Sequence, residues 1–278
     1  MIAKTEAIAL RNVPFSRTSR VVTWLTRDYG RIVTVIKGAC RPKSFFLGQI
    51  DLAYRCELLF YRRDSNGVHN IREVWPVDCR DDFLRTDWCA AVAADYLCWL
   101  TAQTTEPMLD SSTLFEKLDE ALGDLASGKT PAGILLRYEF QLLDALGLSP
   151  NFAPCKDCIL PEWRRRSCRF LIGSGHLSCV HSLGHHSSES SVALPVELVE
   201  ALRQLQGTSR DDGGEEAAAK FASLNGELVT GIRRFLGLFL CHHLDISMLA
   251  RQTAFHWLDL DLQSKNALAA PKPRQASS

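Results

Sequence analysis

The hydrophobic pattern of this chain changes its period close to residue 80, and that change limits the folds that the chain can adopt. Up to that point apolar and polar residues alternate in short runs, which is the pattern of a β-strand with one buried face. From about residue 84 onwards, apolar residues recur at helical spacing. The sequence therefore predicts an α+β protein in which a strand-rich part precedes a mainly α-helical part.

About five short strands are expected in the first 80 residues. The runs 21–26 and 31–37 are rich in β-branched residues, and Gly30 before the second run can take the positive φ of a tight turn, so we expect a hairpin. Further strands are expected over 6–13, 52–60 and 68–77. Five strands without a helix-length insertion favour a small closed barrel such as the OB fold. An SH3-like barrel remains the alternative, because the pattern does not separate the two.

Helices are expected in two blocks after the strands. The first block holds helices over about 84–101 and 111–126, and a third that begins at Thr130-Pro131 and ends near Gly147. This third helix is apolar around much of its circumference, so we expect it at the centre of a helical core. The second block holds helices at about 195–206 and 215–245. A flexible break is expected at 207–214, and a disordered tail from about residue 262.

The charge of the chain is distributed unevenly. The totals are 32 Lys+Arg and 32 Asp+Glu, but residues 1–80 hold 14 basic and 7 acidic side chains, which leaves 18 and 25 for the remainder. The two parts therefore carry about +7 and −7. This split indicates an anionic partner for the strand-rich part, with chance clustering on a solvated surface as the alternative.

Basic and aromatic side chains are interleaved in residues 1–46. The aromatic members are Phe15, Tyr29, Phe45 and Phe46, and residues 37–44 form a basic segment in which a phosphate could approach the backbone. Cations displace counterions from phosphates and aromatic faces stack on unpaired bases, so the combination favours nucleic-acid binding. The alternative is that the aromatic residues fill the barrel, and this is what we expect for Trp24.

A candidate zinc site lies in residues 151–193. Cys155 and Cys158 have the CxxC spacing of a zinc knuckle, and Cys179 with His181 can complete a tetrahedral Cys3His site. One structural zinc is therefore expected. The main alternative is a degenerate knuckle without metal, and a redox-active CxxC is a minor one because the βα context is missing.

Common catalytic motifs are absent from the sequence. There is no GxxxxGK[ST], GxSxG or HExxH segment, so we expect that the protein is not an enzyme. No membrane segment and no secretory signal are recognisable, which predicts a cytoplasmic protein with reduced cysteines. Cys56, Cys89 and Cys98 are then expected to act as small hydrophobic residues of the core.

Two groups of residues, in the same order along the chain, resemble the RecO family of bacterial recombination mediators. The first group comprises residues 6–11, 19–26, 29–31 and 37–44, and it ends in a Gly-Ala-x-Arg-x-x-Ser pattern. The second comprises Arg137 to Gly147, Pro150 and the CxxC pair. The resemblance extends to about residue 256.

The resemblance implies an OB domain, a helical domain and an inserted zinc finger. We expect the OB domain at 1–80, the helical domain at 81–150 with 194–256, the insertion at 151–193 and the tail at 262–278. Cys155, Cys158 and Cys179 match three cysteines of the family's finger, whereas Ser182 departs from the fourth. The positions that would contact DNA are Arg11, Arg20, Arg31, Lys37, Arg41 and Lys43.

The implied function is DNA repair and recombination. It includes binding of single- and double-stranded DNA, annealing of complementary strands, and loading of the RecA recombinase onto strands coated by single-strand-binding protein (SSB). The implied partners are SSB and RecR. A protein-binding adaptor that acts through the helical domain is the alternative function, and a zinc-dependent enzyme acting on nucleic acid is a third.

Overall fold

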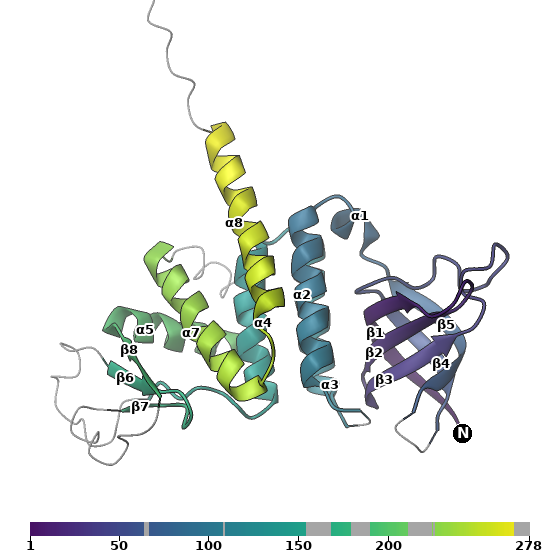
Figure 1. Ribbon diagram of the computed structural model, residues 1–278, viewed down its shortest axis with the longest axis horizontal. Helices are drawn as coiled ribbons and strands as arrows, with labels where there is room; N and C mark the ends of the chain where they lie inside the picture. Colours follow the sequence, from purple (N-terminus) through teal and green to yellow (C-terminus); the bar gives the residue numbers. More distant parts are fainter. Residues whose placement is uncertain are drawn as a thin grey trace, which may run out of the picture.

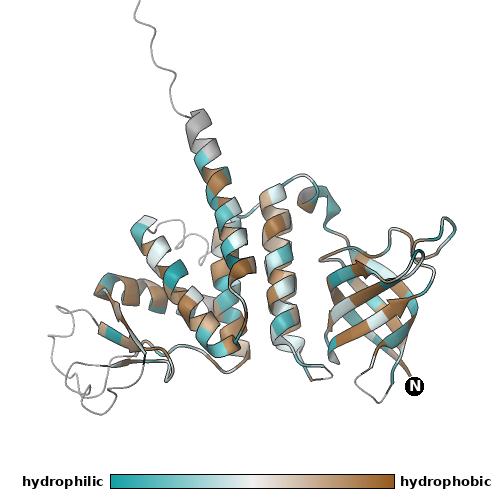
Figure 2. Ribbon diagram, in the orientation of Figure 1, coloured by the Kyte–Doolittle hydropathy of each residue, from teal (hydrophilic) through white to brown (hydrophobic). Residues whose placement is uncertain are grey.

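The computed structural model describes residues 1–63, 67–107, 109–153, 168–178, 190–210, 224 and 226–269. Five strands form one end of the molecule, long helices lie in the middle, and a small three-stranded sheet with two further helices forms the other end (Figure 1). Hydrophobic residues recur along the strands and along the central helices (Figure 2), as expected for elements that bury one face. This arrangement confirms the α+β class.

The five expected strands are confirmed. They are β1 Ile2–Pro14, β2 Arg20–Thr26, β3 Gly30–Ile36, β4 Arg55–Tyr61 and β5 His69–Asp78. They close on themselves in the order β1-β2-β3-β5-β4, and all pairs are antiparallel except β3 with β5. β4 begins three residues later than the expected 52–60 run, because the chain still turns at Ala53, which has a φ of 64°.

The barrel has its own hydrophobic core. Val22, Trp24, Ile32, Leu58 and Phe60 belong to this core and are fully buried or nearly so. Trp24 Nε1 donates a hydrogen bond to Thr34 Oγ1 at 2.9 Å, so its one polar group is satisfied inside the barrel. The expectation that Trp24 is a core residue is therefore confirmed.

The outside of the barrel is packed against the helices. Ile8, Leu10 and Leu25 belong to the same core cluster as the helical residues that follow, although they lie on barrel strands. At the β2–β3 turn, Gly30 has a φ of +58°, and a Cβ atom placed on it would lie 2.2 Å from the carbonyl oxygen of Leu109. Only glycine fits there, because the backbone of the segment before α3 lies directly against this turn.

Seven helices are described after the barrel. They are α1 Asp81–Leu84, α2 Trp88–Thr104, α3 Ser112–Ala126, α4 Pro131–Ala145, α5 Val196–Arg210, α7 Gly226–Leu244 and α8 Leu249–Ala269. The continuous helix expected over 84–101 is wrong at its start. Asp87 accepts hydrogen bonds from the backbone N–H groups of Cys89 and Ala90 at 2.8 and 3.1 Å, so it caps a new helix there.

The expected place of α4 is confirmed. It begins at Pro131, ends two residues before Gly147, which has a φ of +70°, and buries every residue from Ile134 to Leu143. Two charged residues lie within this buried run. Arg137 pairs with Asp124 at 2.5 Å, and Glu139 pairs with Arg251 at 2.7 Å, so neither charge is left uncompensated.

Two expected irregular segments are partly helical. The break expected at 207–214 is wrong for residues 207–210, because α5 continues through Gly207 to Arg210. The tail expected to be disordered from 262 is wrong for 262–269, which belong to α8. Leu, Gln, Lys and Ala in that stretch are strong helix formers, and α8 projects beyond the body of the molecule (Figure 1). Residues 211–223 and 270–278 lie outside the described part of the chain.

A three-stranded sheet occupies part of the 151–193 segment. Its strands are β6 Cys168–Leu171, β7 His176–Ser178 and β8 Ser191–Leu194, in the order β7-β6-β8. Phe170 of β6 contacts Phe235 edge-on at 4.9 Å and Phe239 at 5.9 Å, which attaches the sheet to α7. Among the helices of the described residues, none is long and apolar enough to cross a membrane.

Candidate nucleic-acid interface

Two loops lie together at one end of the barrel. One joins β1 to β2 over residues 15–19, and the other joins β3 to β4 over residues 37–54. The backbone N–H of Cys40 donates to the carbonyl of Thr18 at 3.0 Å, and the N–H of Gly38 donates to Ser19 Oγ at 3.5 Å. We call residues 15–19 and 37–47 the loop surface.

The second loop is anchored by its apolar residues. Ala39 and Tyr54 belong to the barrel core, and Phe46 and Ile50 pack against it from the same loop. Asn12 on β1 donates through Nδ2 to the carbonyl of Ile50 at 3.1 Å. With these residues turned inward, the charged residues between them are left exposed.

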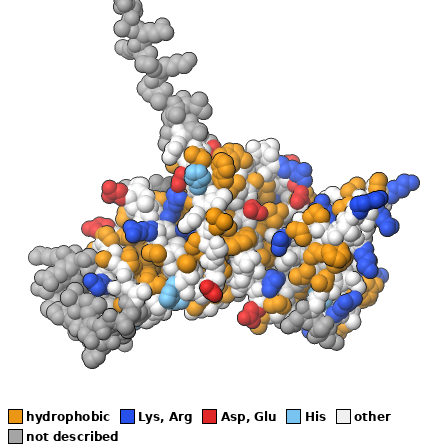
Figure 3. All heavy atoms as spheres, viewed as in Figure 1, with side chains coloured by type: hydrophobic (Ala, Val, Ile, Leu, Met, Phe, Trp, Pro, Cys, Tyr) orange, Lys and Arg blue, Asp and Glu red, His pale blue; other side chains and the backbone are white. Residues whose placement is uncertain are grey.

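The loop surface carries positive charge that no described carboxylate neutralises. Arg17, Lys37, Arg41 and Lys43 are all exposed, and no ion pair within the described residues involves any of them. Several other basic residues of the barrel are paired: Lys4 with Glu57 at 2.9 Å, Arg27 with Glu6 and Glu116 at 2.9 Å, Arg55 with Asp119 at 2.8 Å and Arg80 with Asp78 at 2.8 Å. Figure 3 shows Lys and Arg side chains gathered at the barrel end of the molecule.

Four of the six expected DNA contacts lie at or beside the loop surface. Lys37, Arg41 and Lys43 belong to it, and Arg20 lies next to it because Arg20 pairs with Ile36 in the β2–β3 ladder. Arg20 Nη1 donates to Asn12 Oδ1 at 3.2 Å, so its guanidinium is held in place. Arg11 follows a bulge in β1, lies opposite Thr23 and is exposed on the outside of the barrel.

The sixth expected contact, Arg31, lies elsewhere. It is at the opposite end of β3 from Lys37, roughly 20 Å away along an extended strand. Its Nε donates to the carbonyl of Thr105 at 2.8 Å, and its backbone N–H donates to the carbonyl of Glu106 at 3.2 Å. These bonds join the barrel to the segment after α2, and a DNA-binding role for Arg31 stays a prediction.

The four aromatic residues named from the sequence divide into two kinds. Phe15 and Phe45 are exposed on the loop surface, whereas Tyr29 and Phe46 pack against the barrel core. The sequence reasoning missed Trp75, an exposed residue of β5 that contacts Phe45. The available signal was the alternation of β5, in which buried Val74 predicts that Trp75 points outward.

Comparison with known proteins places this architecture in a family. Residues 1–80 match the family model described as "Recombination protein O N terminal", and residues 85–252 match "Recombination protein O C terminal". The chain belongs to the RecO family. Relatives include proteins named DNA repair protein RecO from Bacillus cytotoxicus, 27% identical over 206 residues, and from Bacillus anthracis, 26% identical over 208 residues. Each match covers 74% of this chain and 79% of the relative.

Membership of the RecO family confirms the resemblance seen in the sequence. The C-terminal match ends at residue 252, so most of α8 lies beyond the part that the family model covers. Residues 37–47, which carry three of the four unpaired cations of the loop surface, lie within the N-terminal match.

The expected zinc ligands lie outside the described residues of this RecO family member. Cys155, Cys158, Cys179 and His181 all fall in the two gaps on either side of β6 and β7, so the zinc site stays a prediction. Within the described ranges, no group of three or more His, Cys, Asp or Glu side chains could hold a metal ion.

The buried cysteines of the core have unreactive thiols. Burial raises the pKa of the Cys56 and Cys98 thiols to about 12, so both stay protonated near neutral pH. Because the thiolate is the reactive form, these residues act as hydrophobic side chains and not as nucleophiles. The expectation that Cys56, Cys89 and Cys98 are core residues is confirmed by their burial.

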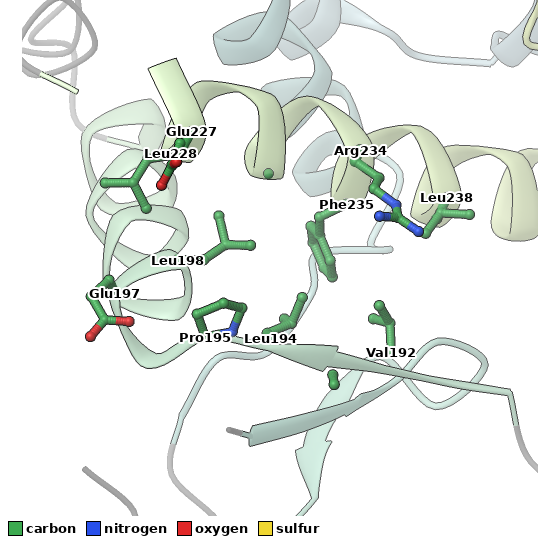
Figure 4. Close-up of a pocket in the computed structure, with 12 residues that line it drawn as sticks. Val192, Leu194, Pro195, Glu197, Leu198, Glu227, Leu228, Arg234, Phe235 and Leu238 are labelled. Atoms are coloured by element: carbon green, nitrogen blue, oxygen red, sulfur yellow. The ribbon is translucent and has the colours of Figure 1, made fainter. Parts of the chain in front are cut away.

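A pocket of about 720 Å³ lies at the other end of this RecO chain (Figure 4). It is formed by β8, α5 and α7, and its apolar lining includes Leu194, Leu198, Phe235 and Leu238. Its charged residues are separated: Glu197 and Glu227 lie toward one side, and Arg234 lies beside Leu238 on the other. The pocket therefore combines an apolar lining with charged side chains at two separate places on its rim.

Proposed function

We propose that this RecO family member binds single- and double-stranded DNA through the loop surface and acts in DNA repair and recombination. The observation that carries the proposal is the set of unpaired cations Arg17, Lys37, Arg41 and Lys43 at one end of the barrel. We add Arg11 and Arg20 as neighbouring contacts, and we keep Arg31 as a weaker candidate because its guanidinium is already bonded to Thr105. The family membership supports the repair role.

We further propose that the barrel is an OB fold. The strand order β1-β2-β3-β5-β4 with a parallel β3–β5 pair supports this assignment over an SH3-like barrel. OB folds bind oligonucleotides on the face of strands 2 and 3 and on the loop between strands 1 and 2. In this chain that loop is residues 15–19, which belongs to the loop surface.

The proposed mechanism is annealing without covalent chemistry. Cations on the loop surface lower the repulsion between two polyanionic strands, and they contact phosphates while the base edges stay free to pair. A nucleophile or general base is not needed for this task. The same protein would then help to load recombinase onto SSB-coated strands, with SSB and RecR as partners and one zinc held by Cys155, Cys158, Cys179 and His181.

The test is binding of mixed-sequence single strands as a function of salt concentration, followed by strand annealing in the presence of SSB. Each phosphate contact should contribute about 0.7 to the slope of log affinity against log salt, so four to six contacts give a slope of about −3 to −4. We expect annealing of complementary strands to proceed on SSB-coated DNA. A flat salt dependence would show that the loop surface does not bind DNA.

The pocket between β8, α5 and α7 favours a second function, that of a protein-binding adaptor. We place the contact with SSB in this pocket. Leu238→Glu adds a carboxylate to an exposed lining residue and is expected to weaken SSB binding about tenfold. The measurement is a binding titration with purified SSB after nuclease treatment.

Leu249→Glu provides the matched control, because Leu249 is also an exposed leucine but does not line the pocket. Equal loss of SSB binding in the two variants would place the contact elsewhere. If wild-type protein bound SSB but had no affinity for DNA, the adaptor function would replace the annealing function.

A further inference from the structure

Phe45 and Trp75 form an exposed aromatic pair on the outside of the barrel. Their ring centroids are 5.0 Å apart at an interplanar angle of 75°, and the residues are 54% and 47% exposed. Leu47 and Val77, two residues further along the same segments, are also about half exposed. Single exposed apolar residues are ordinary, but a cluster that includes two large aromatic rings indicates a binding surface.

Each residue of the pair is next to a residue that packs in or against the barrel core. Phe46 packs against the barrel core and contacts Phe45 edge-on at 5.9 Å, so a core-packed ring supports the exposed ring of Phe45. Trp75 lies on β5 opposite Glu57 of β4, and its neighbour Val74 is fully buried. Both rings therefore have buried neighbours behind them and present aromatic surface to solvent.

The surroundings of the pair favour a polyanionic ligand. The nearest carboxylates on β4 and β5 are already paired, Glu57 with Lys4 at 2.9 Å and Glu73 with Arg72 at 3.3 Å. The unpaired Arg41 and Lys43 precede Phe45 in the same loop. The pair thus lies next to the unpaired cations of the loop surface. On the side of β4 and β5, the neighbouring carboxylates are neutralised by their partners.

We propose that Phe45 and Trp75 are a stacking platform for an unpaired base of single-stranded DNA. This inference rests on the proposed function and names the part of the surface that distinguishes a single strand from a duplex. Stacking uses the face of a base, which a duplex hides and a single strand offers. It also leaves the Watson–Crick edge of the base free, as annealing requires.

Trp75→Ala is expected to weaken the binding of a mixed-sequence single strand about tenfold, at every salt concentration and without a change of salt slope, because no phosphate contact is lost. Duplex DNA and a strand of the same length with abasic sugars should bind the variant as they bind the wild type, since neither offers a free base face. Phe45→Ala should show the same selectivity, and Trp75→Phe should retain most of the affinity. Far-UV circular dichroism of each variant verifies the fold.

Trp257→Ala is the matched control. Trp257 is 44% exposed and contacts Trp88 edge-on at 5.7 Å, but it lies on α8, far along the chain from the barrel. The Trp257→Ala variant should bind single strands with the affinity of the wild type. The platform is overturned, and the proposed function kept, if Trp75→Ala binds single strands as tightly as Trp257→Ala while both keep the wild-type salt slope.

Two other results also overturn the platform. Equal weakening of single-stranded, duplex and abasic DNA would mean that Trp75 acts through the fold of the barrel. Loss of SSB or RecR binding with DNA affinity intact would assign the pair to a protein partner. Absence of any salt-dependent DNA affinity in the wild type would overturn both the platform and the proposed function.

Discussion

A variant in which Arg17, Lys37, Arg41 and Lys43 are all replaced by glutamine is expected to bind single-stranded DNA about 200-fold more weakly at 0.15 M salt. The reason is counterion release: each lost phosphate contact lowers the salt slope by about 0.7, which corresponds to roughly fourfold in affinity at that salt concentration. The slope should therefore fall by about 3, and the difference from the wild type should shrink as salt approaches 1 M. Fluorescence anisotropy across a salt series measures both quantities.

The matched comparison uses two variants with the same loss of charge. Lys37→Gln with Arg41→Gln removes two unpaired cations, whereas Lys4→Gln with Arg169→Gln removes two exposed cations outside the loop surface, one of them paired with Glu57. We expect the first variant to lose about 1.4 from the salt slope and the second to keep nearly all of it. Equal losses would mean that net charge alone, and not the loop surface, drives binding.

Glu139→Ala is expected to lower the free energy of unfolding by about 3–5 kcal/mol, which is the usual cost of leaving one member of a buried ion pair without its partner. Glu139 is fully buried, and its carboxylate accepts hydrogen bonds from Arg251 at 2.7 and 2.9 Å and from Tyr96 Oη at 2.7 Å. Gly237 of α7 leaves the space for this guanidinium, since a Cβ there would lie 2.8 Å from Arg251 Nη1. The substitution therefore disturbs α2, α4, α7 and α8 together, and urea denaturation followed by circular dichroism measures the loss.

The control for Glu139→Ala is Glu200→Ala, which removes an exposed glutamate from α5 and should change stability by no more than about 0.5 kcal/mol. The double variant Glu139→Met with Arg251→Met removes both charges and should be more stable than Glu139→Ala, because no uncompensated guanidinium remains. A double variant less stable than the single one would show that the two charges are not coupled in this way.

Local signals were sufficient for much of the fold. The β2–β3 hairpin could be predicted because Gly30 stands where the turn requires a positive φ, and Trp24 could be assigned to the core from its aliphatic neighbours on the strand. The start and end of α4 follow from Pro131 and Gly147. The break before α2 could not be predicted in this way, because Leu84 and Trp88 are four residues apart and keep helical spacing across the turn.

The candidate site depends on contacts between distant parts of the chain, which explains why only part of it could be predicted. Whether a basic residue is free or neutralised is decided by tertiary pairing, as in Arg27 with Glu116 and Arg31 with the carbonyl of Thr105. The Phe45–Trp75 contact joins residues 30 positions apart and requires the position of the loop against β5. Which residues are basic or aromatic is evident from the sequence, but their neighbours are not.

The packing of Ile8, Leu10 and Leu25 against the helices has a consequence for how the two ends of the molecule work together. Proteins that join two binding modules by a flexible linker bring their ligands together with an effective concentration set by linker length. In this chain, the loop surface and the pocket between β8, α5 and α7 are connected by packed side chains and not by a flexible linker. A DNA strand held at one end and a partner held at the other would be kept at a set separation and orientation, so the protein would act as a spacer between them.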